Sequence, residues 1–144
     1  MVTGTVVVLP SDQHPRLREL LLDGDHLIDT GFQAVDITPV DGPDAALATR
    51  VCAAIGMAAP HPPLVIVALG SSALMLPAVA LAQRAAHRRV AQYVLVDPVL
   101  PDATDSWPDA RVIVFTDDPG PLPILRGWDA SPLAALATWR PHTA

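Results

Sequence analysis

Apolar residues gather in five short runs that are rich in Val and Ile. Three of these runs are nearly continuous, without the alternation of apolar and polar residues that a half-exposed strand would show. Continuous runs of this kind are typical of strands that are buried on both faces, as in a parallel sheet covered by helices. The predicted strands are Thr5–Leu9, Gln33–Ile37, Leu64–Leu69, Ala91–Val96 and Arg111–Phe115.

Helical periodicity fills the stretches between these runs. Pro15–Asp23 begins with a proline at its first position and is followed by a glycine, and Asp44–Gly56 follows an Asp-Gly-Pro-Asp start signal. Ser72–Arg89 is the longest predicted helix, and Ser131–Trp139 is the last. Strands that alternate with helices predict an α/β fold: a three-layer, doubly wound parallel sheet in one domain, residues 1–144.

Composition excludes several classes of function. All 9 basic residues are Arg, so the lysine of a phosphate-binding P-loop or of a Schiff base is missing. The bias against Lys and Asn, with abundant Ala and Pro, is typical of a GC-rich genome. A net charge of −6 argues against nucleic-acid binding, and a single cysteine excludes a disulfide framework. With no metal-ligand spacing, signal peptide or membrane span in the sequence, we expect a cytoplasmic protein without a metal or a membrane partner.

The most informative segment is the strand Leu64–Leu69, which runs into Gly70-Ser71-Ser72 and then into an Ala-rich helix. Ligands of doubly wound sheets bind beyond the carboxyl ends of the strands, so this turn lies on the functional rim. A serine at a strand–turn–helix junction is the arrangement of a nucleophile elbow. The alternative is that Ser71 and Ser72 only cap the helix.

Here the chain resembles the α/β-hydrolase superfamily. Gly70-Ser71-Ser72-Ala73-Leu74 is similar to its Gly-x-Ser-x-Gly elbow, Val94–Pro98 to the strand that follows, and Leu27–Ile37 to a preceding helix end, turn and strand. The resemblance implies about five strands in the order 2-1-3-4-5, Ser72 as nucleophile, an ester or thioester substrate and no cofactor. Two positions depart from the pattern: Leu74 replaces the second glycine, and Pro77 predicts that the helix starts later or bends.

The resemblance also implies an acid after a later strand. Asp117 and Asp118 stand at the usual position and Asp97 at a known alternative one, although Asp before Pro or Gly is also common in turns. The same resemblance places an oxyanion hole at Ser11 and Asp12, which with Ser71 and Ala73 form the predicted oxyanion and substrate-binding set.

The expected base is missing, because Trp128 stands where the family has its histidine. We expect Trp128 to lie near Ser72 and to fill part of that position. Among the histidines, His14 belongs to the functional rim, where it could reach Ser72 with Asp12 or another acid orienting it; the alternative is a plain helix cap. His142 is close to the end of the sequence.

Two functions follow. The first is a small serine hydrolase that acts on a small-molecule or acyl substrate; the second is a degenerate hydrolase-like fold that serves as a binding or structural module, or as a non-covalent catalyst such as a cyclase. The length fits the five-strand core of the family and leaves no room for a cap or outer strands. An uncovered edge near Arg111–Phe115 or the Trp128–Trp139 region predicts a homodimer. The alternative is that Trp139 packs within the chain from the last helix.

Overall fold

A six-stranded, all-parallel sheet forms the centre of the protein in a computed structural model that describes residues 3–38, 46–101, 107–118 and 128–141. The strand order is β2-β1-β3-β4-β5-β6. The α/β class and the order of the first five strands are therefore confirmed. The strands are β1 (Gly4–Val8), β2 (Phe32–Asp36), β3 (Leu64–Leu69), β4 (Val90–Val96), β5 (Arg111–Phe115) and β6 (Asp129–Ser131).

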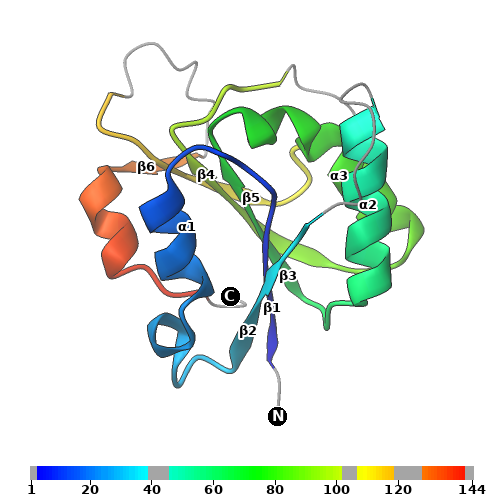
Figure 1. Ribbon diagram of the computed structural model, residues 1–144, viewed down its shortest axis with the longest axis horizontal. Coiled ribbons are helices and arrows are strands. Elements are labelled where there is room, and N and C mark those ends of the chain that lie inside the picture. Colours follow the sequence, from blue (N-terminus) through cyan, green and yellow to red (C-terminus); the bar gives the residue numbers. More distant parts are fainter. Residues whose placement is uncertain (1–2, 39–45, 102–106, 119–127, 142–144) are drawn as a thin grey trace.

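Helices cover both faces of this sheet (Figure 1). One face carries α1 and the turn η4, and the other carries α2 and α3. The elements are α1 (Pro15–Leu22), α2 (Leu47–Ala58) and α3 (Leu76–Ala85), with the 3₁₀ turns η1 (Gly24–Leu27), η3 (Gly70–Met75) and η4 (Leu133–Ala137). Residues 39–45, where the second helix was predicted to start, lie outside the described residues.

The central strand β3 explains why apolar residues run without interruption. Every side chain of Leu64–Leu69 is 0% exposed. Ile66 and Ala68 pack in the core under α2 and α3, whereas Val65 and Val67 pack in the core under α1 and η4. Burying one such aliphatic side chain stabilises the fold by roughly 1.5–3 kcal/mol, so the two cores hold the carboxyl end of β3 in a fixed position.

The long predicted helix Ser72–Arg89 is shorter in the structure. The chain leaves β3 through the 3₁₀ turn η3, and α3 begins only at Leu76, with Pro77 in its first turn. Proline suits this place because the first amides of a helix have no partner within the helix. The prediction that Pro77 delays the helix is confirmed.

The last predicted helix is the main difference. Asp129–Ser131 forms β6, which pairs with β5, and only Leu133–Ala137 turns helically. Arg111 secures the added strand, because its Nε donates a 3.0 Å hydrogen bond to Asp129 Oδ2. The expectation that the length excludes any strand beyond the fifth is therefore wrong, and β5 is not an uncovered edge.

The aromatic side chains behind the predicted homodimer also have partners within the chain. Trp139 packs against the α1–η4 core beside His26, with ring centroids 6.5 Å apart. Trp128 packs edge-on against Trp107, with centroids 5.7 Å apart. The features that suggested a dimer thus have explanations inside one chain, and the homodimer stays a prediction.

Candidate functional site

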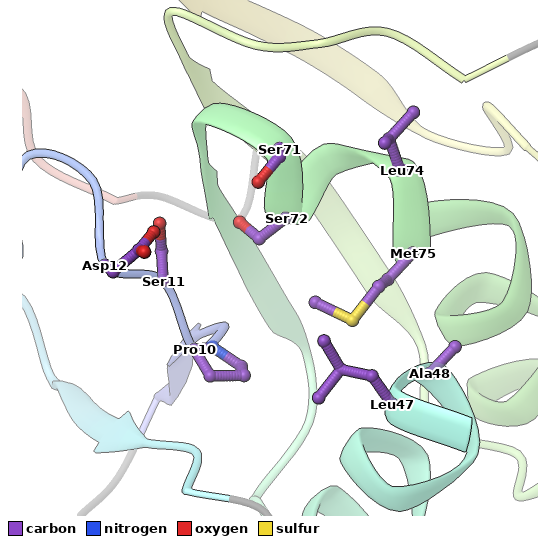
Figure 2. Close-up of a pocket in the computed structure, with 9 residues that line it drawn as sticks. All are labelled: Pro10, Ser11, Asp12, Leu47, Ala48, Ser71, Ser72, Leu74 and Met75. Atoms are coloured by element: carbon purple, nitrogen blue, oxygen red, sulfur yellow. The ribbon is translucent and has the colours of Figure 1, made fainter. Parts of the chain in front are cut away.

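An open hollow lies where the strand order reverses. The connection after β1 goes to α1 on one face, and the connection after β3 goes through η3 to α3 on the other, so the loops after β1 and β3 separate at the rim. Such a switch point is the usual ligand site of a doubly wound sheet. Here it holds a hollow of about 760 Å³ (Figure 2), lined by Pro10, Ser11, Asp12, Leu47, Ala48, Ser71, Ser72, Leu74 and Met75.

The turn that follows β3 depends on Gly70. Its φ of +59° lies in the left-handed region, which a residue with a Cβ adopts at a cost. A Cβ at this position would also overlap the side-chain amide of Gln13. The left-handed residue of the junction is therefore Gly70, and Ser72 follows two residues later inside η3.

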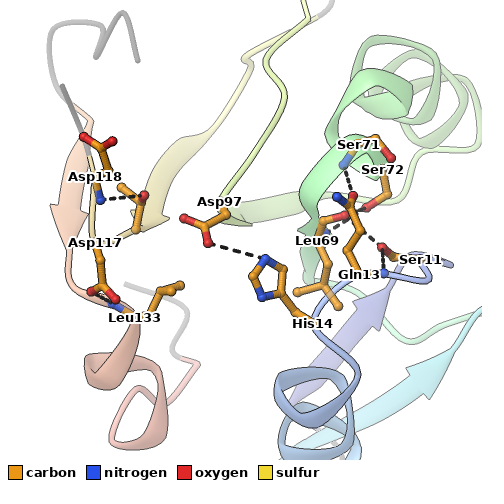
Figure 3. Close-up of polar contacts among 11 residues, drawn as sticks. Ser11, Gln13, His14, Leu69, Ser71, Ser72, Asp97, Asp117, Asp118 and Leu133 are labelled. Carbon is orange, nitrogen blue, oxygen red and sulfur yellow. Dashed lines mark hydrogen bonds and ion pairs between the residues drawn. The ribbon is translucent and has the colours of Figure 1, made fainter. Parts of the chain in front are cut away.

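Ser72 uses its hydroxyl to close this turn. The Leu69 amide donates to Ser72 Oγ at 2.8 Å, and Ser72 Oγ lies 2.9 Å from the Leu69 carbonyl oxygen, to which it donates (Figure 3). The residue is only 5% exposed, although it contributes to the wall of the hollow. Ser72 is thus the third residue of η3, and its hydroxyl reaches back to the backbone of the N-cap residue Leu69, as the N3 side chain of a capping box does.

The β1–α1 loop is fastened to the same turn by residues that were predicted to bind an oxyanion and by one that was not. Ser11 Oγ donates to the Leu69 carbonyl at 3.1 Å and accepts from the Gln13 amide at 3.0 Å. The Ser71 amide donates to Gln13 Oε1 at 2.7 Å. Sequence reasoning missed Gln13, and its only signal was its place in a polar loop after a buried strand.

His14 and Asp97 meet above the sheet. His14 Nε2 lies 3.4 Å from Asp97 Oδ2, and the two side chains are 28% and 35% exposed. Figure 3 shows the imidazole directed at Asp97. His14 stands at the N-cap of α1, yet its side chain makes no capping hydrogen bond among the described residues. The structure thus brings together two of the predicted site residues, His14 and Asp97.

Both members of this pair have unusual backbone conformations. The φ of His14 is +51° and that of Asp97 is +42°. Left-handed backbone is uncommon for residues other than glycine and costs of order 1–3 kcal/mol where it is strained. Five described non-glycine residues have a positive φ, and His14 and Asp97 are two of them whose side chains also face each other.

The two acids after β5 have local contacts. Asp117 Oδ1 accepts a 3.0 Å hydrogen bond from the amide of Leu133, the first residue of η4. The Asp118 amide donates to Thr116 Oγ1 at 3.2 Å, and both aspartates are exposed. Asp117 therefore ties the β5 loop to η4, and the acid that contacts a histidine is Asp97.

Three other predicted site residues, Asp12, Ala73 and Trp128, have different surroundings. Asp12 is exposed and lines the hollow, whereas Ala73 is 0% exposed in the core. The ring contact of Trp128 is with Trp107, and its proximity to Ser72 stays a prediction. His142 lies outside the described residues.

Cys52 is the other candidate nucleophile near the hollow, since it lies on α2 one turn after Ala48. Its side chain is half-buried, with Sγ 3.7 Å from the Ala78 carbonyl oxygen. Burial raises the pKa of its thiol above the ordinary value of 9.0. Because only the thiolate is strongly nucleophilic, Cys52 is a packing residue at neutral pH.

Comparisons with family models, curated proteins and solved structures find no match to this chain. Across the residues that the structure describes, no helix combines the length and the apolar character needed to cross a bilayer. The same residues contain no group of three or more His, Cys, Asp or Glu side chains placed to hold a metal ion.

Proposed function

We propose that the protein binds a small amphipathic molecule, neutral or cationic, in the hollow at the switch point, without covalent attack by Ser72. The observation that carries this proposal is the engagement of the Ser72 hydroxyl by both backbone groups of Leu69. A nucleophilic serine needs a base within hydrogen-bond reach, and the imidazole of His14 is directed at Asp97.

The lining of the hollow supports the ligand chemistry. Its polar part consists of three serine residues and the carboxylate of Asp12, and its apolar part includes Leu47 and Met75. No basic side chain is among the described lining residues. Such a wall suits a hydroxyl or ammonium group at one end of a ligand and a hydrocarbon portion at the other.

The test uses three probes of equal chain length: 1-octanol, octylamine and octanoate. We expect octanol and octylamine to shift the amide resonances of Ser11, Asp12 and Ala48 in ¹H–¹⁵N spectra, and octanoate to shift them at least tenfold less at equal concentration. The variant Ala48→Trp fills the hollow and abolishes the shifts, whereas Ala58→Trp, exposed at the end of the same helix, retains them. Shifts that survive in Ala48→Trp contradict the proposal.

A serine hydrolase that acts on an ester or thioester is the competing proposal. It is supported by the strand–turn–helix junction and by two serines, Ser71 and Ser72, that line an open hollow. In that case Ser72 must leave the Leu69 backbone before it reacts. A fluorophosphonate probe with peptide mapping separates the two proposals: we expect no adduct on Ser72, and an adduct that is lost in Ser72→Ala establishes the hydrolase instead.

A further inference from the structure

We propose that His14 and Asp97 form an acid–base pair that promotes the addition of water to activated acyl esters independently of the serines. The proposal goes beyond ligand binding in the hollow, because neither residue is among the lining of that hollow. It rests on the contact between the two side chains, on their exposure and on their backbone conformations.

The contact determines which nitrogen is available. His14 Nε2 is the atom that faces Asp97 Oδ2. A proton on Nε2 is stabilised by the carboxylate, which leaves the lone pair on Nδ1 to accept a proton. The 3.4 Å separation between Nε2 and Oδ2 is longer than a good hydrogen bond. Catalytic hydrogen bonds are often this long in structures without a ligand. With 28% of its side chain exposed, His14 is accessible to water.

The pair joins two loops that the fold holds firmly. The Asp97 amide donates to the Phe115 carbonyl at 3.0 Å, which fixes the end of β4 against β5. His14 precedes Pro15, and its carbonyl accepts the first helical hydrogen bond of α1, from the Arg18 amide at 3.0 Å. Both side chains therefore project from anchored backbone, which limits the entropy lost when they act together.

A helix-capping histidine and a turn aspartate would not need this arrangement. As a cap, His14 would bond amides of α1, and it does not do so among the described residues. As a turn residue, Asp97 could be replaced by glycine, which tolerates a φ of +42° better. The observation that favours a role for the pair is that both side chains, each partly exposed, are directed at each other.

The reaction balances without a cofactor. As the oxygen of water bonds to the carbonyl carbon of p-nitrophenyl acetate, His14 Nδ1 accepts the proton from water. The bond between that carbon and the nitrophenolate oxygen then breaks, and the imidazolium returns its proton to the leaving group or to solvent. The products are acetate and p-nitrophenol. Asp97 acts as a positioning residue that orients the imidazole.

Hydrolysis of p-nitrophenyl acetate by the whole chain tests the proposal. General-base catalysis contributes about 10²–10⁴-fold, so we expect His14→Ala to lower the rate above buffer by about 10²-fold. The matched control is His61→Ala, which removes an exposed imidazole at the opposite end of the sheet and leaves the rate unchanged. Pretreatment with excess fluorophosphonate also leaves it unchanged, since no serine takes part.

The role of Asp97 needs a readout that a structural role would not move. We expect ¹⁵N spectra of the histidine ring to show His14 protonated on Nε2 and to lose this preference in Asp97→Asn. Asp97→Glu restores part of both the preference and the rate. A wild-type rate no higher than that of His14→Ala, an equal loss in His61→Ala, or inhibition by the fluorophosphonate overturns the proposal. The octanol and octylamine shifts are measured separately, so a failure here is distinct from a failure of the binding proposal.

Discussion

The turn after β3 and the pair formed by the loops after β1 and β4 lie on the same rim, but they use their polar side chains differently. In the turn, Ser11 and Ser72 bond to the backbone of Leu69, and the left-handed position is a glycine. In the pair, His14 and Asp97 face each other, and the left-handed positions carry full side chains. Polar groups that satisfy the backbone stabilise the fold, whereas partly exposed side chains that face each other are available for chemistry. The two regions should therefore respond to mutation in opposite ways.

The largest effect is expected at Gly70. Gly70→Ala places a Cβ in a left-handed residue and displaces the Gln13 amide from Ser71, so the free energy of unfolding falls by about 3 kcal/mol. Urea denaturation measures the loss. Gly24→Ala is the control, because a Cβ there meets nothing within 4 Å. If the two variants are equally stable, the turn does not depend on its glycine.

Ser72 and Ser71 provide the next comparison, between a serine whose hydroxyl bonds to the backbone and its exposed neighbour. Ser72→Ala leaves the Leu69 amide without its partner, and we expect a loss of about 2 kcal/mol. Ser71→Ala changes stability by less than about 0.5 kcal/mol. Denaturation midpoints for the two variants decide the matter, and similar losses would mean that Ser72 is not the structural serine.

Two histidines, His26 and His61, are expected to differ in their effect on the pH dependence of stability. Burial, then the nearby charge of Arg140, lowers the pKa of His26 below its ordinary 6.5. The unfolded chain therefore binds the proton more readily than the folded one, and stability falls as the pH drops below about 6.5 toward the folded pKa. His26→Gln should flatten this part of a plot of melting temperature against pH, and the exposed His61→Gln should not.

The smallest effect has the opposite sign. His14→Gly relieves a left-handed conformation and loses only a partly exposed contact with Asp97, so we expect stability to rise by up to about 0.5 kcal/mol while any activity of the pair disappears. Glu19→Gly, inside α1, should instead cost about 1 kcal/mol. A destabilised His14→Gly protein would show that the pair serves the fold.

Much of this architecture was predictable from the sequence, because local patterns determine it. Short apolar runs rich in Val and Ile predicted the first five strands, and Pro77 predicted that the helix after β3 starts late or bends. β6 was missed because Asp129–Ser131 has only 3 residues, two of them polar, and becomes a strand only by pairing with β5. Long-range pairing of this kind leaves no periodic signal.

The site was predictable as a set of residues but not as a set of contacts. His14, Asp97 and Ser72 were all named from their positions after buried strands. Their partners depend on backbone angles, because the +51° and +42° values at His14 and Asp97 bring these two side chains together. Gln13 was missed because an amide carries no motif, and only the structure shows that it bonds to Ser71.

The short strand β6 also has a consequence for how the protein behaves at high concentration. Open strand edges are templates for aggregation, and natural sheets limit this by keeping edge strands short or charged. Of the two outer strands described, β6 has only 3 residues, and β2 ends at the exposed Asp36, which is paired with Arg18. By pairing with Ile113–Phe115 of the longer and more apolar β5, the three residues of β6 keep that edge from serving as a nucleus for intermolecular β-structure.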